Sequence, residues 1–335
     1  MSRPWAALRR RVLTPSASET KLSRRGFFEK SPEAKDLLEG AGASFLAGFA
    51  HAAEAREPRE AERGLEELPD HFRGFAYEGA GMAFALRDAT APMRSRHNLR
   101  FLQGRGNEHI YMVYIGAGWA LGRVPAPLWQ RATRGLADPV LRWLILDGYG
   151  FHQAYFHTEK YVHRQFVRSG FPWPSSAQSP YANRVIDQGI GRAMWFVHGA
   201  DPKRASQGID AFPKARQGDL YAGASLAATY AGGLAESELL EFKQRGHRFL
   251  PEIAQASAFA ATARVRSGLV TAHTELATRT LAGTTPEHAA KVCTAAFPDA
   301  SENTPSGEPA FEVWRRRTAA ALLGEQDEPV ASDHR

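Results

Sequence analysis

The pattern of apolar and small residues along the chain predicts helices almost throughout. Ala, Leu, Phe and Trp recur at helical spacing, and the β-branched and aromatic run of a strand occurs clearly only at 110–115. That run leads directly into a glycine-containing segment of helical pattern, so we predict that it is helical too. Ser31, Pro32 and Glu33 have the order of a helix N-terminus, with a cap, a first-turn proline and an early acid. We therefore predict an all-α protein.

A short motif of small residues repeats within this pattern. Its first small residue falls at positions 40, 79, 116, 148, 189 and 223, and more faintly at 256, so successive copies are 32 to 41 residues apart. Such periods are typical of helical hairpins that bury their faces only by stacking on one another. We predict a tetratricopeptide-like α-solenoid of about six to seven units, either open or curled into a compact globule.

The residues of the motif indicate why the helices would stack closely. Small residues at i and i+4, such as Gly79 and Ala83, share one helix face and let a neighbouring backbone approach. Each helical glycine costs roughly 1 kcal/mol relative to alanine, so a close contact has to compensate. The competing interpretation, a phosphate-binding Gly-x-Gly turn, needs a preceding strand and a third glycine. No copy has that glycine in place, so dinucleotide binding is not expected.

Three segments are expected along the chain. Residues 1–30 form a basic N-terminal arm, residues 31–324 a single helical repeat domain, and residues 325–335 a disordered acidic tail. Arg24 and Arg25 resemble a twin-arginine export signal, but a charged, proline-containing stretch follows instead of an apolar one. We therefore predict a cytoplasmic protein.

The composition narrows the classes of function. Hydrophobic residues make up 43% of the chain and charged residues 23%, as in soluble globular proteins. The sequence has no apolar run long enough for a membrane span. The net charge of +6 is not arranged as a basic stripe interleaved with aromatic residues, so we expect no nucleic-acid partner. Cys293 is the only cysteine, which fits a reducing compartment.

The fourth copy of the motif departs most from the others, because residues 146–163 contain three histidines and a glutamate. A predicted helix over 140–166 would place His152, Glu159 and His163 on one face, at 100° per residue. His152 and His163 would lie about 16 Å apart, too far to bind one ion, so we assign no metal site. We take these three residues as catalytic candidates. The alternative is that His152 is a buried structural residue and that Glu159 and His163 form a solvated pair.

The position of His152 is unusual for its residue type. In five other copies the matching position holds serine or alanine. A buried imidazole there would need both room and a polar partner.

Carboxylates also recur beside the motif. Glu39, Glu78 and Asp147 each directly precede a motif glycine, and Asp187 and Gln188 lie close to that register. Repeated buried carboxylates either line a polar axis or cap neighbouring helices. Together with nearby aromatic residues they give our candidates for substrate binding, and we assign no cofactor: Glu78, Trp119, Asp147, Tyr149, Phe151, Tyr155, Gln188, Arg192, Trp195 and Tyr230.

Several motifs resemble a bacterial family labelled as enediyne biosynthesis proteins, whose genes accompany iterative enediyne polyketide synthases. The similar stretches, over roughly residues 3–300, include 5–11, 13–15, 18–20, 25–27, 74–80, 116–120, 147–152, 188–192 and 273–277. The resemblance implies a role in maturing a polyketide-derived polyene toward an enediyne core. It implies no reaction, because no catalytic residues of the family can be transferred.

Two functional hypotheses follow. In the first, an apolar helical cavity binds a polyene intermediate and transforms it by acid–base chemistry, with His152 as the acid or base. In the second, the protein is a non-catalytic scaffold or chaperone that docks the enediyne polyketide synthase or its carrier domain, and its basic arm (Arg9, Arg10 and Arg11) meets an acidic partner surface. Neither hypothesis fixes the oligomeric state, and a homo-oligomer stays open.

Overall fold

The computed structural model describes residues 16–91, 95–172 and 179–327. Over these residues the protein is all-α, which confirms the predicted fold class, and the β-type pairing there is one isolated bridge between Asn303 and Pro309. The stretch at 110–115 is helical, within α7 (Ile110–Leu121). Ser31 caps α3 (Pro32–Glu54) by accepting a hydrogen bond from the backbone N–H of Ala34, as its sequence predicts.

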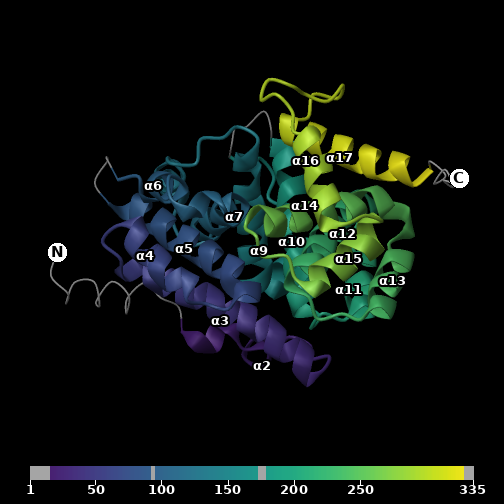
Figure 1. Cartoon of the computed structure of the whole chain (residues 1–335), viewed down its shortest axis with the longest axis horizontal. Helices are drawn as coiled ribbons and strands as arrows, with labels where there is room; N and C mark the ends of the chain where they lie inside the picture. The colour runs from purple at the N-terminus through teal and green to yellow at the C-terminus, as the bar shows by residue number, and fades with distance from the viewer. Residues whose placement is uncertain (1–15, 92–94, 173–178, 328–335) are drawn as a thin grey trace, which may run out of the picture.

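The remaining elements lie in chain order in Figure 1. The α-helices are α2 (Leu22–Arg25), α4 (Pro58–Glu66), α5 (Asp70–Thr90), α6 (His97–Leu102), α8 (Trp129–Ala132), α9 (Leu144–Phe156), α10 (Ser179–Val197), α11 (Pro202–Asp210), α12 (Lys214–Ala231), α13 (Glu236–Arg245), α14 (Leu250–Arg266), α15 (Ala272–Ala282), α16 (Pro286–Ala295) and α17 (Ala310–Asp327). Short 3₁₀ turns are η1 (Ala17–Thr20), η2 (Arg105–Asn107), η3 (Ala126–Leu128), η4 (Leu141–Trp143) and η7 (His247–Phe249), and η5 (Glu159–His163) is a π-helical turn.

Seven long helices form an inner series in which each packs against the next: α3, α5, α7, α9, α10, α12 and α14. Neighbours in this series run parallel. Trp143 packs against Tyr181 just before the start of α9, and Tyr155 packs against Phe196 near the ends of α9 and α10. The chain returns between inner helices mostly through shorter ones (α4, α6, α8, α11 and α13), so successive helices pack as antiparallel pairs. Helices α3 and α12 are also in contact, which brings the early and late parts of the series together (Figure 1).

The motif glycines mark the crossings of the inner helices. A Cβ at Gly116 would lie less than 3.0 Å from the carbonyl oxygen of Glu78 in α5, and one at Gly118 equally close to that of Ile145 in α9. The same arrangement recurs in α5, α9 and α10: the first glycine faces the preceding inner helix and the second faces the next. The predicted close backbone contacts are therefore confirmed. The two faces are those of i and i+2, on opposite sides of the helix, rather than the single i, i+4 face expected from the sequence.

The first copy of the motif was placed wrongly. In α3 the equivalent contacts belong to residues 46–48, because Gly79 faces the carbonyl oxygen of Phe45 and Gly48 faces that of Ala76. Gly40 and Gly42 meet side chains instead, those of Phe72 and Thr20. In this copy Leu46 stands where the other copies have their first glycine. Choosing Gly40 because it is a glycine therefore places the motif six residues too early.

The N-terminal segment from residue 16 is part of the folded body. Leu22 and Phe27 are buried, and the backbone N–H of Phe28 donates to the carbonyl oxygen of Val197. Glu39 accepts the backbone N–H of Leu22 at 3.0 Å and so caps α2, which is one of the two roles expected for this carboxylate. Residues 1–15 of the predicted arm, including Arg9 to Arg11, lie outside the described residues. So do residues 328–335 of the predicted tail, whereas α17 extends to Asp327.

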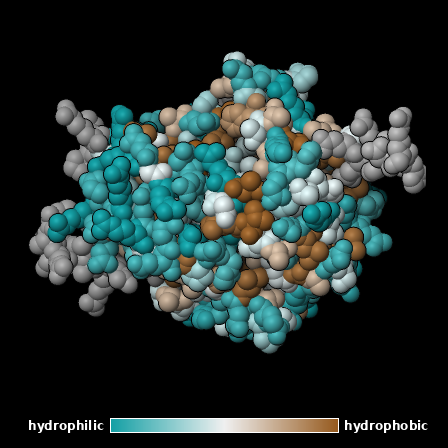
Figure 2. Space-filling model, in the orientation of Figure 1, coloured by the Kyte–Doolittle hydropathy of each residue, from teal (hydrophilic) through white to brown (hydrophobic). Residues whose placement is uncertain are grey.

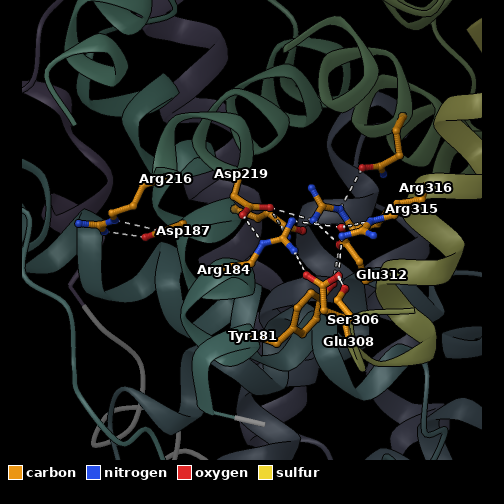
Figure 3. Close-up of polar contacts among 12 residues, drawn as sticks. Tyr181, Arg184, Asp187, Arg216, Asp219, Ser306, Glu308, Glu312, Arg315 and Arg316 are labelled. Atoms are coloured by element: carbon orange, nitrogen blue, oxygen red, sulfur yellow. Dashed lines mark hydrogen bonds and ion pairs between the residues drawn. The ribbon is translucent and has the colours of Figure 1, made fainter. Parts of the chain in front are cut away.

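A buried ionic network attaches α17 to α10 and α12 (Figure 3). Arg315 lies 2.8 Å from Asp219 and 2.8 Å from Glu312, and it also donates to the side-chain oxygen of Gln255. Arg184, which lies in α10, pairs with the same two carboxylates, with Asp219 at 2.9 Å and with Glu312 at 3.1 Å. Each buried charge thus has opposite charges within contact distance, which offsets the cost of removing it from water.

The surface differs along the molecule. Hydrophobic residues gather around the middle of the face shown in Figure 2, whereas the end that holds α4 and α6 is largely polar. Among the described helices, none combines the length and the apolar character that a bilayer crossing requires.

Candidate functional site

The inner helices surround an apolar cavity. Side chains at a fixed place in the motif, three residues after its first glycine, contribute to the wall from five successive inner helices: Met82, Trp119, Phe151, Arg192 and Leu226. Further aromatic side chains come from residues one turn away, including Phe75, Tyr155, Phe196 and Tyr230. One face of the repeated motif therefore builds the cavity.

The cavity reaches the surface beside η1. Glu19 and Thr20 of η1 are partly exposed and line this end together with the exposed Arg123. Arg25 attaches η1 to α9, because its guanidinium pairs with Glu19 at 2.7 Å and donates to the carbonyl oxygen of Tyr155 at 2.8 Å. The N-terminal segment thus forms one rim of the opening.

Glu78 is a carboxyl group placed inside this apolar wall. It directly precedes Gly79, which holds α5 against α3, so that the side chain of Glu78 faces the cavity. Its Oε1 accepts a hydrogen bond of 2.9 Å from the indole N–H of Trp119. Burial raises the pKa of the Glu78 carboxyl from its ordinary 4.5 to about 7, although the charge of Arg192 and the bond from Trp119 act in the opposite direction. The group can therefore hold or release a proton near neutral pH.

Arg192 faces Glu78 from α10 across the same wall. Its Nε lies 2.6 Å from Oδ1 of Asp147, its Nη2 lies 3.9 Å from Oε1 of Glu78, and its guanidinium carbon lies 4.9 Å from the ring centre of Phe151. Within the described part of the chain, neither Nε nor Nη2 has an acceptor in hydrogen-bonding geometry. Burial also raises the pKa of Asp147, against the charge of Arg192. The guanidinium is therefore ion-paired with Asp147 through Nε, while its Nη2 has no bonded acceptor among the described residues.

The two expectations for the repeated carboxylates both apply, at different positions. Glu78 and Asp147 both lie next to Arg192, and the three side chains form a polar cluster in the wall of the cavity. Glu39 caps α2, and Asp187 pairs with Arg216 of α12 at 2.6 Å.

Comparison with known proteins gives a family. Residues 4–322 match the family described as a protein of unknown function, DUF1702. The chain belongs to the DUF1702 family. No curated protein and no solved structure matches it. Membership in DUF1702 covers nearly the whole chain and thus the whole cavity, while the predicted association with enediyne biosynthesis stays a prediction.

In this DUF1702 protein the helix predicted over 140–166 is wrong. Helix α9 ends at Phe156, His157 leaves the helical conformation, and the π-turn η5 follows. The hydroxyl of Thr158, just after the break, donates to the carbonyl oxygen of Ala154. His152, Glu159 and His163 therefore do not share one helical face. Glu159 and His163 are exposed, outside the cavity, and Glu159 pairs with Arg164 at 3.0 Å.

His152 lies just behind the cavity wall. Its ring is 5.9 Å from Trp119 and 4.8 Å from Phe156, both of which line the cavity, while His152 does not. Gly122 provides the expected room, since a Cβ there would collide with the imidazole. The expected polar partner is missing among the described residues for both ring nitrogens. Burial and the nearby Arg123 lower the pKa of His152 to about 3, so the ring is neutral at physiological pH.

Six of the ten predicted binding residues line the cavity: Glu78, Trp119, Phe151, Tyr155, Arg192 and Tyr230. The other four lie outside its lining. Asp147 supports Arg192, and Gln188 donates to Asp219 at 3.2 Å. Tyr149 packs against Trp129 and Phe171, and Trp195 packs against Phe242.

Sequence reasoning missed Met82, Met112 and Leu226 as lining residues. Met82 and Leu226 each follow a first motif glycine by three residues, as do Trp119, Phe151 and Arg192. This shared register is a signal in the sequence that could have found them. Among the described residues, no group of three histidine, cysteine, aspartate or glutamate side chains is placed to hold a metal ion.

Proposed function

We propose that this DUF1702 protein binds a long, apolar, unsaturated small molecule in its central cavity. The observation that carries the proposal is an apolar enclosure with a few polar groups aimed into it, Glu78, Trp119 and Arg192. Small-molecule sites are characteristically apolar clefts in which a few polar groups fix the orientation of the ligand. The spare donors of Arg192 would bind an oxygen of the ligand.

The resemblance to enediyne biosynthesis proteins supports a more specific proposal. The ligand would be a polyketide-derived polyene intermediate, and the protein would act as an accessory protein of that pathway. Conjugated chains are flat and apolar, which suits walls formed by Phe75, Trp119 and Phe151. We propose in addition that the parallel inner helices and their return helices are repeat units of one curled solenoid.

The most suitable group for acid–base chemistry is Glu78 rather than His152. Glu78 lines the cavity, and its raised pKa of about 7 matches what a general acid or base needs near neutral pH. His152 is separated from the cavity by Trp119 and Phe156. In this proposal the Glu78 carboxyl exchanges a proton with the polyene, and Arg192 stabilises the negative charge that develops on a ligand oxygen.

Native mass spectrometry tests the binding proposal. We expect the protein co-expressed with its polyketide synthase to carry a bound small mass that is absent when the protein is expressed alone. Met82→Trp, which fills the cavity, should lose that mass, whereas Glu159→Gln on the surface should keep it. A stable complex with the synthase and no small mass would contradict the proposal and support the scaffold hypothesis instead.

A further inference from the structure

A second apolar cavity lies next to the first. It is lined by the N-terminal half of α7, the first residue of α9, and parts of α12, α14 and α17. Its own wall residues are almost entirely apolar and include Ile115, Leu144, Phe259 and Trp314. Nothing in the acid–base proposal uses this space.

Three side chains belong to the walls of both cavities: Met112, Leu226 and Tyr230. Tyr230 is held in place by Arg264, whose guanidinium carbon lies 3.9 Å from the ring centre and whose Nη2 donates to the Tyr230 carbonyl oxygen at 2.8 Å. Met112 and Leu226 have purely apolar side chains that no hydrogen bond can hold. A methionine side chain is flexible and adapts to neighbouring shapes. In the partition between the two cavities, Tyr230 is therefore held in place, whereas Met112 and Leu226 can change conformation.

We propose that Met112 and Leu226 form an internal gate through which a linear apolar chain passes from the main cavity into the second one. The polar end of the ligand, a carboxyl or carbonyl group, is held at Glu78, Trp119 and Arg192, and its far end fills the space beside Phe259 and Trp314. The inference rests on the proposed function, because it names the ligand class of the same site. It makes chain length the property that the protein selects.

The chemistry of the two compartments supports this assignment. The charged groups described at the main cavity, Glu78 and Arg192, have no counterpart in the lining of the second, where the polar side-chain atoms belong to Thr262, two tyrosines and Trp314, whose indole N–H donates to the carbonyl oxygen of Cys293. Thr262 is already satisfied, since its hydroxyl donates to the carbonyl oxygen of Ala258 at 2.7 Å. The second cavity therefore suits a hydrocarbon segment. Each methylene buried there should raise the affinity by roughly threefold to fourfold.

Binding measurements with chains of different length test the gate. The full-length protein is titrated with cis-parinaric acid, a fluorescent conjugated tetraene acid, which is then displaced by saturated fatty acids of about 8 to 18 carbons. We expect the affinity of the wild type to keep rising with length up to the longest chains. Met112→Phe, which enlarges the gate residue, should weaken the longest acids by at least about tenfold and leave the shortest unchanged.

Two other variants keep the test decisive. Met112→Ala should preserve long-chain binding, and it covers the case in which the phenylalanine variant fails to fold. Met82→Phe is the matched control, because Met82 lines only the main cavity and its enlargement should weaken short and long acids alike. A length profile in Met112→Phe and Met112→Ala that equals the wild-type profile would overturn the gate but leave the binding proposal intact. If the wild type binds no acid of any length, the binding proposal fails, and the gate with it.

Discussion

Two buried arginines of this protein have opposite surroundings. Arg315 in α17 meets two carboxylates and an amide oxygen, so its guanidinium is matched by protein groups (Figure 3). Arg192 in α10 is equally buried, but two of its nitrogens have no acceptor in good geometry among the described residues. The carboxyl nearest its free side, Glu78, has a pKa raised to about 7.

This difference suggests that the charge of Arg315 stabilises the fold, whereas that of Arg192 can take part in the proposed function. Buried polar groups in folded proteins nearly always have hydrogen-bond partners, so an exception beside a cavity calls for a partner from outside the chain, either a water or a ligand. The network around Arg315 lies between packed helices with its charges already paired. The group around Arg192 lies at a cavity and keeps unused donors. Substitution of either arginine, and titration of Glu78, would test this contrast.

Removing Arg315 should be the most damaging change. Arg315→Met leaves the buried carboxylates Asp219 and Glu312 with the partly exposed Arg184 but without Arg315, and breaking such a buried pair costs up to about 3 to 5 kcal/mol of unfolding free energy. Urea unfolding followed by circular dichroism measures the loss. Arg316→Met is the control, because Arg316 is half-exposed on the same helix and its loss should cost less than about 1 kcal/mol. Equal costs for the two variants would contradict the structural role of Arg315.

The pH dependence of stability should report the raised pKa of Glu78. Because the folded protein holds this proton more tightly than the unfolded chain, the free energy of unfolding falls as the pH rises from about 4.5 to about 7, and the contribution is constant above that. Glu78→Gln should remove this part of the slope, at most about 3 kcal/mol.

The measurement is urea unfolding of both proteins at several pH values. Asp187, whose pKa burial raises to about 6, adds a slope of the same sign in both, so the difference between the two proteins isolates Glu78. Parallel curves for wild type and Glu78→Gln would show that folding does not raise the pKa of this carboxyl.

Removing Arg192 should affect binding more than stability. Arg192→Met deletes the spare donors, and we expect the affinity for cis-parinaric acid to fall by roughly 10-fold to 100-fold, as for a lost charged hydrogen bond. The stability loss should be smaller than for Arg315→Met, since Asp147 can take up a proton. Arg216→Met, which breaks a pair with Asp187 outside the central cavity, should leave the affinity unchanged. A similar loss of affinity in both variants would mean that the effect is indirect.

His152→Ala should change the affinity by less than about threefold, because the ring lies behind Trp119 and Phe156. Product formation in a producing strain should likewise persist. A steep loss of product with the protein still folded would return the catalytic role to His152 and argue against Glu78.

The fold could be predicted well because its signals are local. Paired glycines and their spacing indicated stacked helices, and Ser31 and Pro32 marked a helix start that the structure confirms. The register in α3 could not be read, because Leu46 replaces the glycine there while Gly40 and Gly42 imitate the motif. The end of α9 was equally hidden. No proline or glycine lies at His157, so the residue types there give no signal for the end of the helix.

The site was only partly predictable, because burial depends on which face of each helix points inward. Trp119, Phe151 and Arg192 were found by residue type, and Met82 and Leu226, at the same register, were not. Glu78 was singled out as a carboxylate, but its raised pKa depends on apolar neighbours from other helices. Such long-range surroundings cannot be derived from spacing along one helix.

The paired glycines have a consequence for which substitutions this protein can accept. Because backbone touches backbone on both sides of α5, α7, α9 and α10, the frame around the cavity is set without the side chains that face inward. Those side chains can then change one at a time while the spacing of the helices stays constant. If the cavity binds a ligand as proposed, a new ligand preference would need substitutions only at the few motif positions that line the cavity. The spacing of the helices would not have to change.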